Sequence, residues 1–196
     1  METINERIYR ITPLHLNMLD KLQDKRCEAL YASLCEEFGE IAMALKIHHK
    51  IVRHKTLPEP ITGEAVDLYI CAVALQSEIA TEYMRWDDDK IKYTMPDVRP
   101  VNLYLLPEEH KDDDPAFLDL TVLAEAGWYV GRIGQALWKY KKKESIKAEM
   151  GILCLELARV SYTMFTLHRK DEVFDDIVNA KLDKWEKNIA TLPPRN

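Results

Sequence analysis

Two pairs of carboxylates stand out in this chain because their spacing places each pair on one side of a helix. Residues 36–40 read Glu-Glu-Phe-Gly-Glu, and residues 64–67 read Glu-Ala-Val-Asp. Side chains three or four positions apart on a helix are neighbours, and like charges at that spacing repel by roughly 0.2–0.5 kcal/mol per pair. If the two helices lie antiparallel, four carboxylates meet at one place. This arrangement predicts a bound hard cation, which prefers oxygen ligands.

Both pairs are expected to point toward the core rather than toward solvent. Acid spacings of this kind also arise by chance among 33 acidic residues in 196, and most acidic clusters are solvated surfaces. Glu37, however, lies at the edge of a helical apolar stripe, and Glu64 lies in register with the apolar face of an uncharged segment. Acids that point toward a core need a partner, and a metal ion is the simplest one. The apolar positions are Leu34, Phe38, Ile41 and Leu45 in the first segment and Leu68, Cys71 and Leu75 in the second.

The apolar periodicity predicts an all-α helical bundle that carries both acidic motifs near its core. Thr12-Pro13 is a typical helix start, and Pro58 and Pro60 interrupt the chain between the two motifs. The segment 86–115 holds several prolines and two Asp triplets, so it is predicted to be a connection, briefly extended over 101–106. The predicted helices cover residues 12–24, 25–54, 61–83, 116–142, 144–168 and 171–190.

The two halves share an order of residues that indicates an internal duplication within a single domain. Residues 39–46 align with residues 131–138, with Gly, Ile, Ala and Leu at equivalent places. In place of Glu40 and Asp67 the second copy has Arg132 and Ile152, neither of which supplies an oxygen ligand. Metal binding is therefore expected in the first half alone. The predicted organisation is one domain over 1–196, with a first repeat at 13–85, a connector at 86–115 and a degenerate second repeat at 116–191.

Together, the motifs resemble those of the MazG-like all-α nucleotide pyrophosphohydrolases, a superfamily that also takes in dimeric dUTPases and phosphoribosyl-ATP pyrophosphohydrolases. Residues 36–40 match the Glu-Glu-x-x-Glu motif of that superfamily, and residues 64–67 match its Glu-x-x-Asp motif. Lys184 and Asn188 look like its Lys-x-x-x-Asn element on the last helix, although Thr191 stands where a basic residue usually follows.

The resemblance implies cleavage of a nucleoside triphosphate between the α- and β-phosphates, with Mg²⁺ as cofactor and Mn²⁺ as a substitute. Glu36 and Glu37 are the implied catalytic residues, with Glu36 supporting the ligands or acting as base for a water. The likeness extends over residues 25–80 and continues over 120–190 as a degenerate echo. The implied metal ligands are Glu37, Glu40, Glu64 and Asp67.

No glycine-rich phosphate loop is present, so the cation and basic side chains must hold the phosphates of the substrate. Trp185, beside Lys184, is the best candidate for stacking on the base. The full set of predicted substrate-binding residues is Lys46, Lys50, Arg53, Lys184, Trp185 and Asn188, with Lys187 as a further basic candidate.

Composition narrows the range of partners. The net charge of −6 speaks against non-specific binding to nucleic acid or to a membrane surface. The N-terminus lacks the apolar run of a signal peptide, and no stretch is expected to reach the roughly 20 apolar residues of a membrane span.

Cys35 and Cys71 occupy positions suited to a small apolar residue, so buried free thiols in a reducing cytoplasm are expected. The oligomeric state stays open between a monomer and a homodimer.

A run of histidines marks the end of the second predicted helix. His48, His49 and His54 are predicted to form a solvated tip, where the helix dipole favours positive side chains, with metal ligation as the alternative. No Glu-x-x-His motif occurs, which argues against a ferritin-like di-iron bundle.

Two functions from different classes follow. The first is a Mg²⁺-dependent nucleoside triphosphate pyrophosphohydrolase, favoured by the intact acidic motifs. The second is a catalytically reduced binding or protein-interaction module of the same fold, favoured by the degenerate second half.

Overall fold

A computed structural model of the chain describes residues 2–18, 26–52, 59–80, 114–140 and 147–191. Within these ranges all regular structure is helical, which confirms the prediction of an all-α bundle. The predicted extended segment at 101–106, most of the connector and Arg53 lie outside the described residues. The helices are α1 (Ile4–Met18), α2 (Arg26–His48), α3 (Ile61–Glu78), α5 (Pro115–Tyr140), α6 (Lys147–His168) and α7 (Phe174–Ala190).

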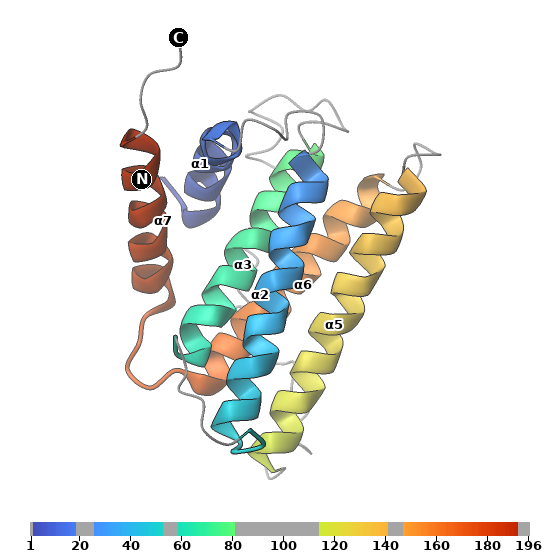
Figure 1. Cartoon of the computed structure of the whole chain (residues 1–196), viewed down its shortest axis with the longest axis vertical. Coiled ribbons are helices and arrows are strands. Elements are labelled where there is room, and N and C mark those ends of the chain that lie inside the picture. Colours follow the sequence, from blue (N-terminus) through green and yellow to red (C-terminus); the bar gives the residue numbers. More distant parts are fainter. Residues whose placement is uncertain (1, 19–25, 53–58, 81–113, 141–146, 192–196) are drawn as a thin grey trace.

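Four of these helices form a bundle in which α2, α3, α6 and α5 follow one another around the ring (Figure 1). Helices α1 and α7 pack on each other and on α3, on the side away from α5 (Figure 1). The hairpins α2–α3 and α5–α6 are the segments assigned to the two repeats, and the duplication itself stays a prediction.

Glycines on α5 allow α2 to approach closely. A Cβ on Gly134 would lie 2.2 Å from the hydroxyl of Tyr31, and a Cβ on Gly127 would lie 3.1 Å from the ring of Phe38. The two aromatic residues and the two glycines are each seven positions apart, in opposite order, so α2 and α5 run antiparallel in fixed register. Tyr31 also donates a hydrogen bond to the carbonyl of Val130 at 3.2 Å.

Helix α3 is the central helix of the fold. Every one of its residues except Asp67 is buried, which confirms that this segment is enclosed nearly all round. Its position between α2, α6, α1 and α7 explains why an uncharged run suits its middle. Its acids lie at the two ends, with Glu64 and Asp67 in the first two turns, where free backbone N–H groups favour negative charge.

The first helix begins earlier than Thr12-Pro13 suggested. Thr3 and Glu6 form a capping box, in which the Thr3 N–H donates to the Glu6 carboxylate at 2.7 Å and the Glu6 N–H donates to the Thr3 hydroxyl at 3.2 Å. Pro13 therefore lies inside α1, and the Thr12 hydroxyl donates to the Ile8 carbonyl instead of capping a helix. The local cap and packing outweigh the preference of proline for a helix start.

Ion pairs fasten α1 to α7. Arg7 donates to Asn179 at 2.8 Å and pairs with Asp183 and Glu186, and Arg10 also reaches Glu186, at 2.9 Å. These contacts fix α7 against the rest of the fold, which matters because α7 contributes to the candidate site.

Two expectations need correction. Cys71 is buried, but Cys35 is exposed, because it lies on the outer face of α2. The residues Glu149–His168 of α6 have the length and mean hydropathy, 1.3, of a membrane span, so the expectation that no segment reaches that composition was wrong. In this fold 56% of that window is buried inside the protein, and α6 packs against α3 and α5. Core helices of a bundle pass the same test, so the segment is weak evidence for membrane insertion.

Candidate metal centre

The two acidic motifs meet where α2 packs against the first turns of α3. Carboxylate oxygens of Glu37, Glu40 and Glu64 all lie within 4.8 Å of one another, and the same is true of Glu59, Glu64 and Asp67. Glu64 is common to both groups and so lies at their centre. The structure thus brings together the four acids that the sequence selected and adds Glu59, one position before the proline that precedes α3.

The carboxylates differ in how far they are withdrawn from water. Glu64 is only 3% exposed, Glu37 and Asp67 are intermediate, and Glu40 is exposed. Burial, followed by repulsion from Asp67, Glu40 and Glu64, raises the pKa of Glu37 to about 8. Burial and the nearby Glu40 and Glu59 raise the pKa of Glu64 to about 7. Because these carboxyl groups are partly buried and repel one another, they stay protonated at pH values where exposed acids are ionised.

An unpartnered atom identifies the point where a cation would bind. The Oε2 atom of Glu64 is fully buried and has no hydrogen-bond partner among the described residues. A buried polar atom without a partner costs roughly 1–3 kcal/mol, so such atoms are rare in folded proteins. Several oxygen ligands at short range around this atom fit a hard divalent cation such as Mg²⁺ or Mn²⁺.

Lys181 of α7 supplies the positive charge nearest to this cluster. Its ammonium lies 2.5 Å from Asp67 Oδ2 and 2.8 Å from Glu59 Oε1. Burial favours the protons of Asp67 and raises the pKa of its carboxyl, although the bond from Lys181 opposes that shift. The same two bonds raise the pKa of Lys181 despite its own desolvation. The sequence reasoning missed Lys181, although it lies three positions before Lys184, on the same side of α7.

A cavity of about 450 Å³ opens beside Asp67 and Lys181. Lys184 and Trp185, both selected from the sequence, line it, and Trp185 is half-buried there. Asn188 is exposed one turn further along α7. The remaining lining residues are Glu59, Asp176, Ile177 and Ala180. The cavity therefore places two ammonium groups and an indole beside the carboxylates.

The other predicted contributors lie further away. Lys46 and Lys50 are both exposed; Lys46 lies about 9 Å beyond Glu40 along the axis of α2 at 1.5 Å per residue, and Lys50 lies past the end of this helix. Glu36 is also exposed and belongs to neither group of clustered carboxylates among the described residues.

The second hairpin contains an ion pair at the aligned positions. Arg132 of α5 lies 2.7 Å from Glu149 of α6, and the guanidinium also lies 5.7 Å from the centre of the Trp128 ring. Ile152, at the position aligned with Asp67, is 60% exposed. These side chains offer one carboxylate that is already paired, and hence no oxygen cluster.

Comparison with known proteins gives no match: no family model, no curated protein and no solved structure is significantly similar to this chain. The fold and the site together define an all-α bundle with a cluster of carboxylates suited to a divalent cation. The likeness to the MazG-like superfamily rests on the motifs alone.

Proposed function

We propose that this protein is a Mg²⁺-dependent nucleoside triphosphate pyrophosphohydrolase that uses the α2–α3 carboxylates. One observation carries the proposal: the carboxylates of Glu37, Glu40 and Asp67 cluster with Glu64, whose buried Oε2 atom has no partner among the described residues, next to a cavity with two lysines. Mutually repelling acids are costly to hold together unless a cation is bound during function. The motifs and their resemblance select the triphosphate and the α–β bond.

The ligands proposed for the ion are Glu37, Glu40, Glu64 and Asp67, and a bound Mg²⁺ would neutralise phosphate charge and lower the pKa of a bound water. Glu36 or a neighbouring acid is the proposed base, because a carboxylate beside the ion can accept a proton from a water that the ion has made more acidic. Lys184 and Lys181 would bind phosphate oxygens from the wall of the cavity, and the Trp185 indole would stack on the base.

In the proposed reaction the oxygen of water bonds to the α-phosphorus, and the bond from this phosphorus to the α–β bridging oxygen breaks. The carboxylate base takes one proton from the water, and pyrophosphate leaves with the bridging oxygen. The products are a nucleoside monophosphate and pyrophosphate.

Hydrolysis in ¹⁸O-labelled water tests this chemistry. A panel of canonical and damaged ribo- and deoxyribonucleoside triphosphates is incubated with the protein and Mg²⁺, and the products are analysed by mass spectrometry. We expect label in the monophosphate alone. Label in inorganic phosphate would indicate a phosphatase and contradict the proposal.

Variants separate chemistry from substrate binding. Glu37→Gln is expected to lower kcat by about 10²–10⁴-fold, the contribution typical of a general base or a ligand to an essential ion. Lys184→Ala is expected mainly to raise KM. Lys139→Ala, an exposed lysine in the last turn of α5, is the matched control and should change neither constant.

The second candidate is a binding module of the same fold, and Lys181 is the observation that favours it. Its ammonium already neutralises Asp67 and Glu59, so part of the cluster is stable without an ion. Under this alternative, nucleotides bind with an affinity that depends on Lys184, but no member of the panel is hydrolysed.

A further inference from the structure

A second group of metal-binding side chains lies where the end of α2 meets the start of α5 and the end of α6. The Nε2 atom of His49 lies 2.7 Å from Asp119 Oδ2, and the Nε2 atom of His168 lies 2.8 Å from Asp119 Oδ1. The ring of His48 lies 4.9 Å from the ring of His49 and 5.2 Å from the ring of His168. The ends of α2 and α6 thus place three imidazoles around one carboxylate of α5. The sequence predicted only a solvated tip at this place.

Asp119 is an unusual residue for the inner face of α5. It is 3% exposed, and both of its oxygens are held by imidazoles. A carboxylate this deeply buried is rare in proteins unless it is paired or coordinates a metal. Burial alone would raise the pKa of Asp119, but the bonds from His168 and His49 lower it, so the carboxylate is charged.

The possible ligand atoms are close enough for a single ion. Atoms of His48, His49 and Asp119 all lie within 4.8 Å of one another. A tetrahedral ion with bonds of about 2.0–2.1 Å holds its ligand atoms about 3.3 Å apart, so shifts of about 1 Å bring these three into range. His168 lies on the other oxygen of Asp119 and would orient that carboxylate, as hydrogen-bond partners of metal ligands usually do.

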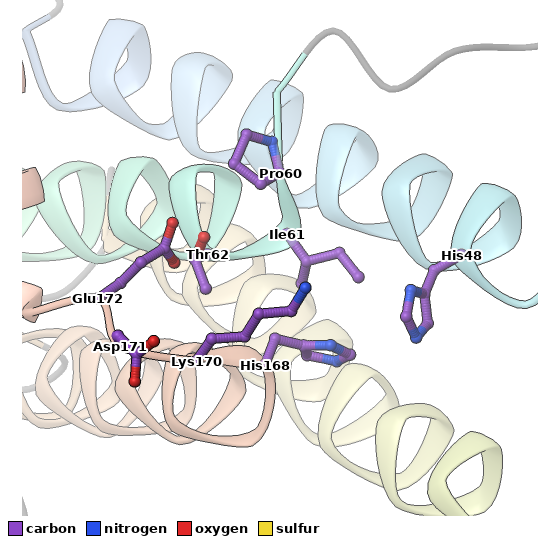
Figure 2. A pocket seen from close by; sticks show the side chains of 8 residues that line it. All are labelled: His48, Pro60, Ile61, Thr62, His168, Lys170, Asp171 and Glu172. Atoms are coloured by element: carbon purple, nitrogen blue, oxygen red, sulfur yellow. The ribbon is translucent and has the colours of Figure 1, made fainter.

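A cavity of about 550 Å³ lies beside this group (Figure 2). His48 from α2 and His168 from α6 both line it, together with Thr62 in the first turn of α3. The hydroxyl of Thr62 is buried, 3% of the residue is exposed, and the hydroxyl has no hydrogen-bond partner among the described residues. It is an unpartnered polar group on the wall of the same cavity, on the side of Glu172 rather than of His48 (Figure 2).

We propose that His48, His49 and Asp119 bind one divalent transition metal ion of the imidazole-preferring class, for which Zn²⁺ is the probe. The ion takes the place of the proton between His49 Nε2 and Asp119 Oδ2, and that proton is released to solvent. Three protein ligands leave one position open, as in zinc sites that bind a water or a substrate, and His48 is the ligand that also lines the cavity.

This site differs in chemistry from the carboxylate centre. Imidazole ligands suit Zn²⁺, Co²⁺, Ni²⁺ and Cu²⁺, whereas carboxylates alone suit Mg²⁺ and Mn²⁺. The two sites are separate: His48, the last residue of α2, is eight residues beyond Glu40, about 12 Å along the helix axis. The proposal therefore stands independently of nucleotide hydrolysis.

Calorimetric titration of the full-length protein with Zn²⁺, in the presence of saturating Mg²⁺, tests the site. We expect one Zn²⁺ per chain, and Co²⁺ should give the visible absorption bands of tetrahedral coordination. His48→Ala should weaken Zn²⁺ binding at least tenfold and reduce the Co²⁺ bands. Because the His48 side chain is exposed, this variant should fold normally, which far-UV circular dichroism checks. His168→Gln should weaken binding about 10–100-fold through the orientation of Asp119.

Two controls make the outcome decisive. Lys46→Ala, an exposed residue in the last turn of α2, and Glu40→Gln, in the carboxylate centre, should leave Zn²⁺ affinity unchanged. Absence of Zn²⁺ binding by the wild-type protein would overturn the proposal, and so would equal loss in Lys46→Ala or unchanged binding in His48→Ala. Because Mg²⁺ stays saturating throughout, failure here leaves the test of nucleotide hydrolysis unaffected.

Discussion

The hairpins α2–α3 and α5–α6 have a similar order of residues, but the charges at their corresponding positions differ: the first has like charges and the second has opposite charges. In the first, Glu40 faces Glu64 within a group of like charges, and Glu64 is 3% exposed. In the second, Arg132 stands opposite Glu149 at 2.7 Å, with side chains 42% and 49% exposed. The carboxylates of the first hairpin therefore need a cation from solution to neutralise them. In the second hairpin, Arg132 neutralises Glu149 within the protein. The difference teaches that with an arginine in place of a glutamate and an isoleucine in place of an aspartate, no group of like charges is left for a metal to neutralise.

The largest expected difference between the hairpins is in cation affinity. Asp67→Asn and Glu40→Gln are expected to lower the affinity for Mg²⁺ or Mn²⁺ by about 100-fold or more, equivalent to about 2.8 kcal/mol. Glu149→Gln is the matched control and should change affinity less than about twofold. Isothermal titration calorimetry measures all three, and an equal loss in Glu149→Gln would contradict the asymmetry between the hairpins.

Lys181 should show how far the first hairpin depends on a built-in cation. Lys181→Met removes two hydrogen-bonded ion pairs whose lysine side chain is only 14% exposed. We expect the metal-free protein to lose about 2 kcal/mol of stability, or about 4–8 °C in Tm. Affinity for Mg²⁺ should rise, because the competing ammonium is gone.

Differential scanning calorimetry in EDTA and in Mg²⁺ separates these two effects. Lys187→Met, an exposed lysine in the last turn of α7, is the control and should behave as wild type. If the Lys181→Met variant is as stable in EDTA as in Mg²⁺, a bound ion does not replace the stabilisation that Lys181 gives to the carboxylates.

The first hairpin should also make stability depend on pH. The pKa of Glu37 is raised to about 8 and that of Glu64 to about 7, from 4.5. The stabilisation from their bound protons is complete below about pH 4.5, because both states are then protonated. As pH rises toward 8 the unfolded chain ionises first, so this contribution to stability is lost.

Thermal melts in EDTA between pH 5 and pH 8 should therefore show a falling Tm. Glu37→Gln, which keeps a neutral side chain at all pH values, should flatten the curve. Mg²⁺ should raise Tm most near pH 8, where it no longer competes with protons. A wild-type curve that stays flat in EDTA across this range would contradict the shifted ionisations.

The smallest effect is expected in the second hairpin. Arg132→Gln breaks an exposed ion pair, and pairs of this kind contribute about 0–1 kcal/mol. The Tm should fall by about 2–4 °C at most, and Mg²⁺ affinity should not change. A large fall would show that the pair with Glu149 and the contact with Trp128 are more important than their exposure indicates.

Periodicity was enough to predict the helices, because long apolar stripes such as that of α3 leave few alternatives. Spacing was also enough to select Glu37, Glu40, Glu64 and Asp67, since residues three apart share a helix face. Boundaries were harder, because Pro13 lies inside a helix that a capping box at Thr3 starts earlier.

Contacts between distant segments could not be read from local patterns. Lys181 reaches Asp67 across 114 positions of sequence, and Asp119 reaches His49 across 70. A signal for Asp119 was nevertheless present, because it is in register with Val122 and Ala126 on the buried face of α5. A lone acid on an apolar stripe was the pattern that had identified Glu64.

The close contact of Tyr31 with Gly134 has a consequence for both sites at once. Helix α2 carries Glu37 and Glu40 in its middle and His48 as its last residue, with His49 directly after it. One helix therefore joins the two sets of proposed ligands. Helix α2 approaches α5 closely at Gly134, where a Cβ would lie 2.2 Å from the hydroxyl of Tyr31. A single carbon atom added there, touching neither site, would displace the Tyr31 ring and with it the hydrogen bond from Tyr31 to the Val130 carbonyl that joins α2 to α5. A glycine that belongs to neither proposed site thus takes part in the packing of the helix that carries ligands of both.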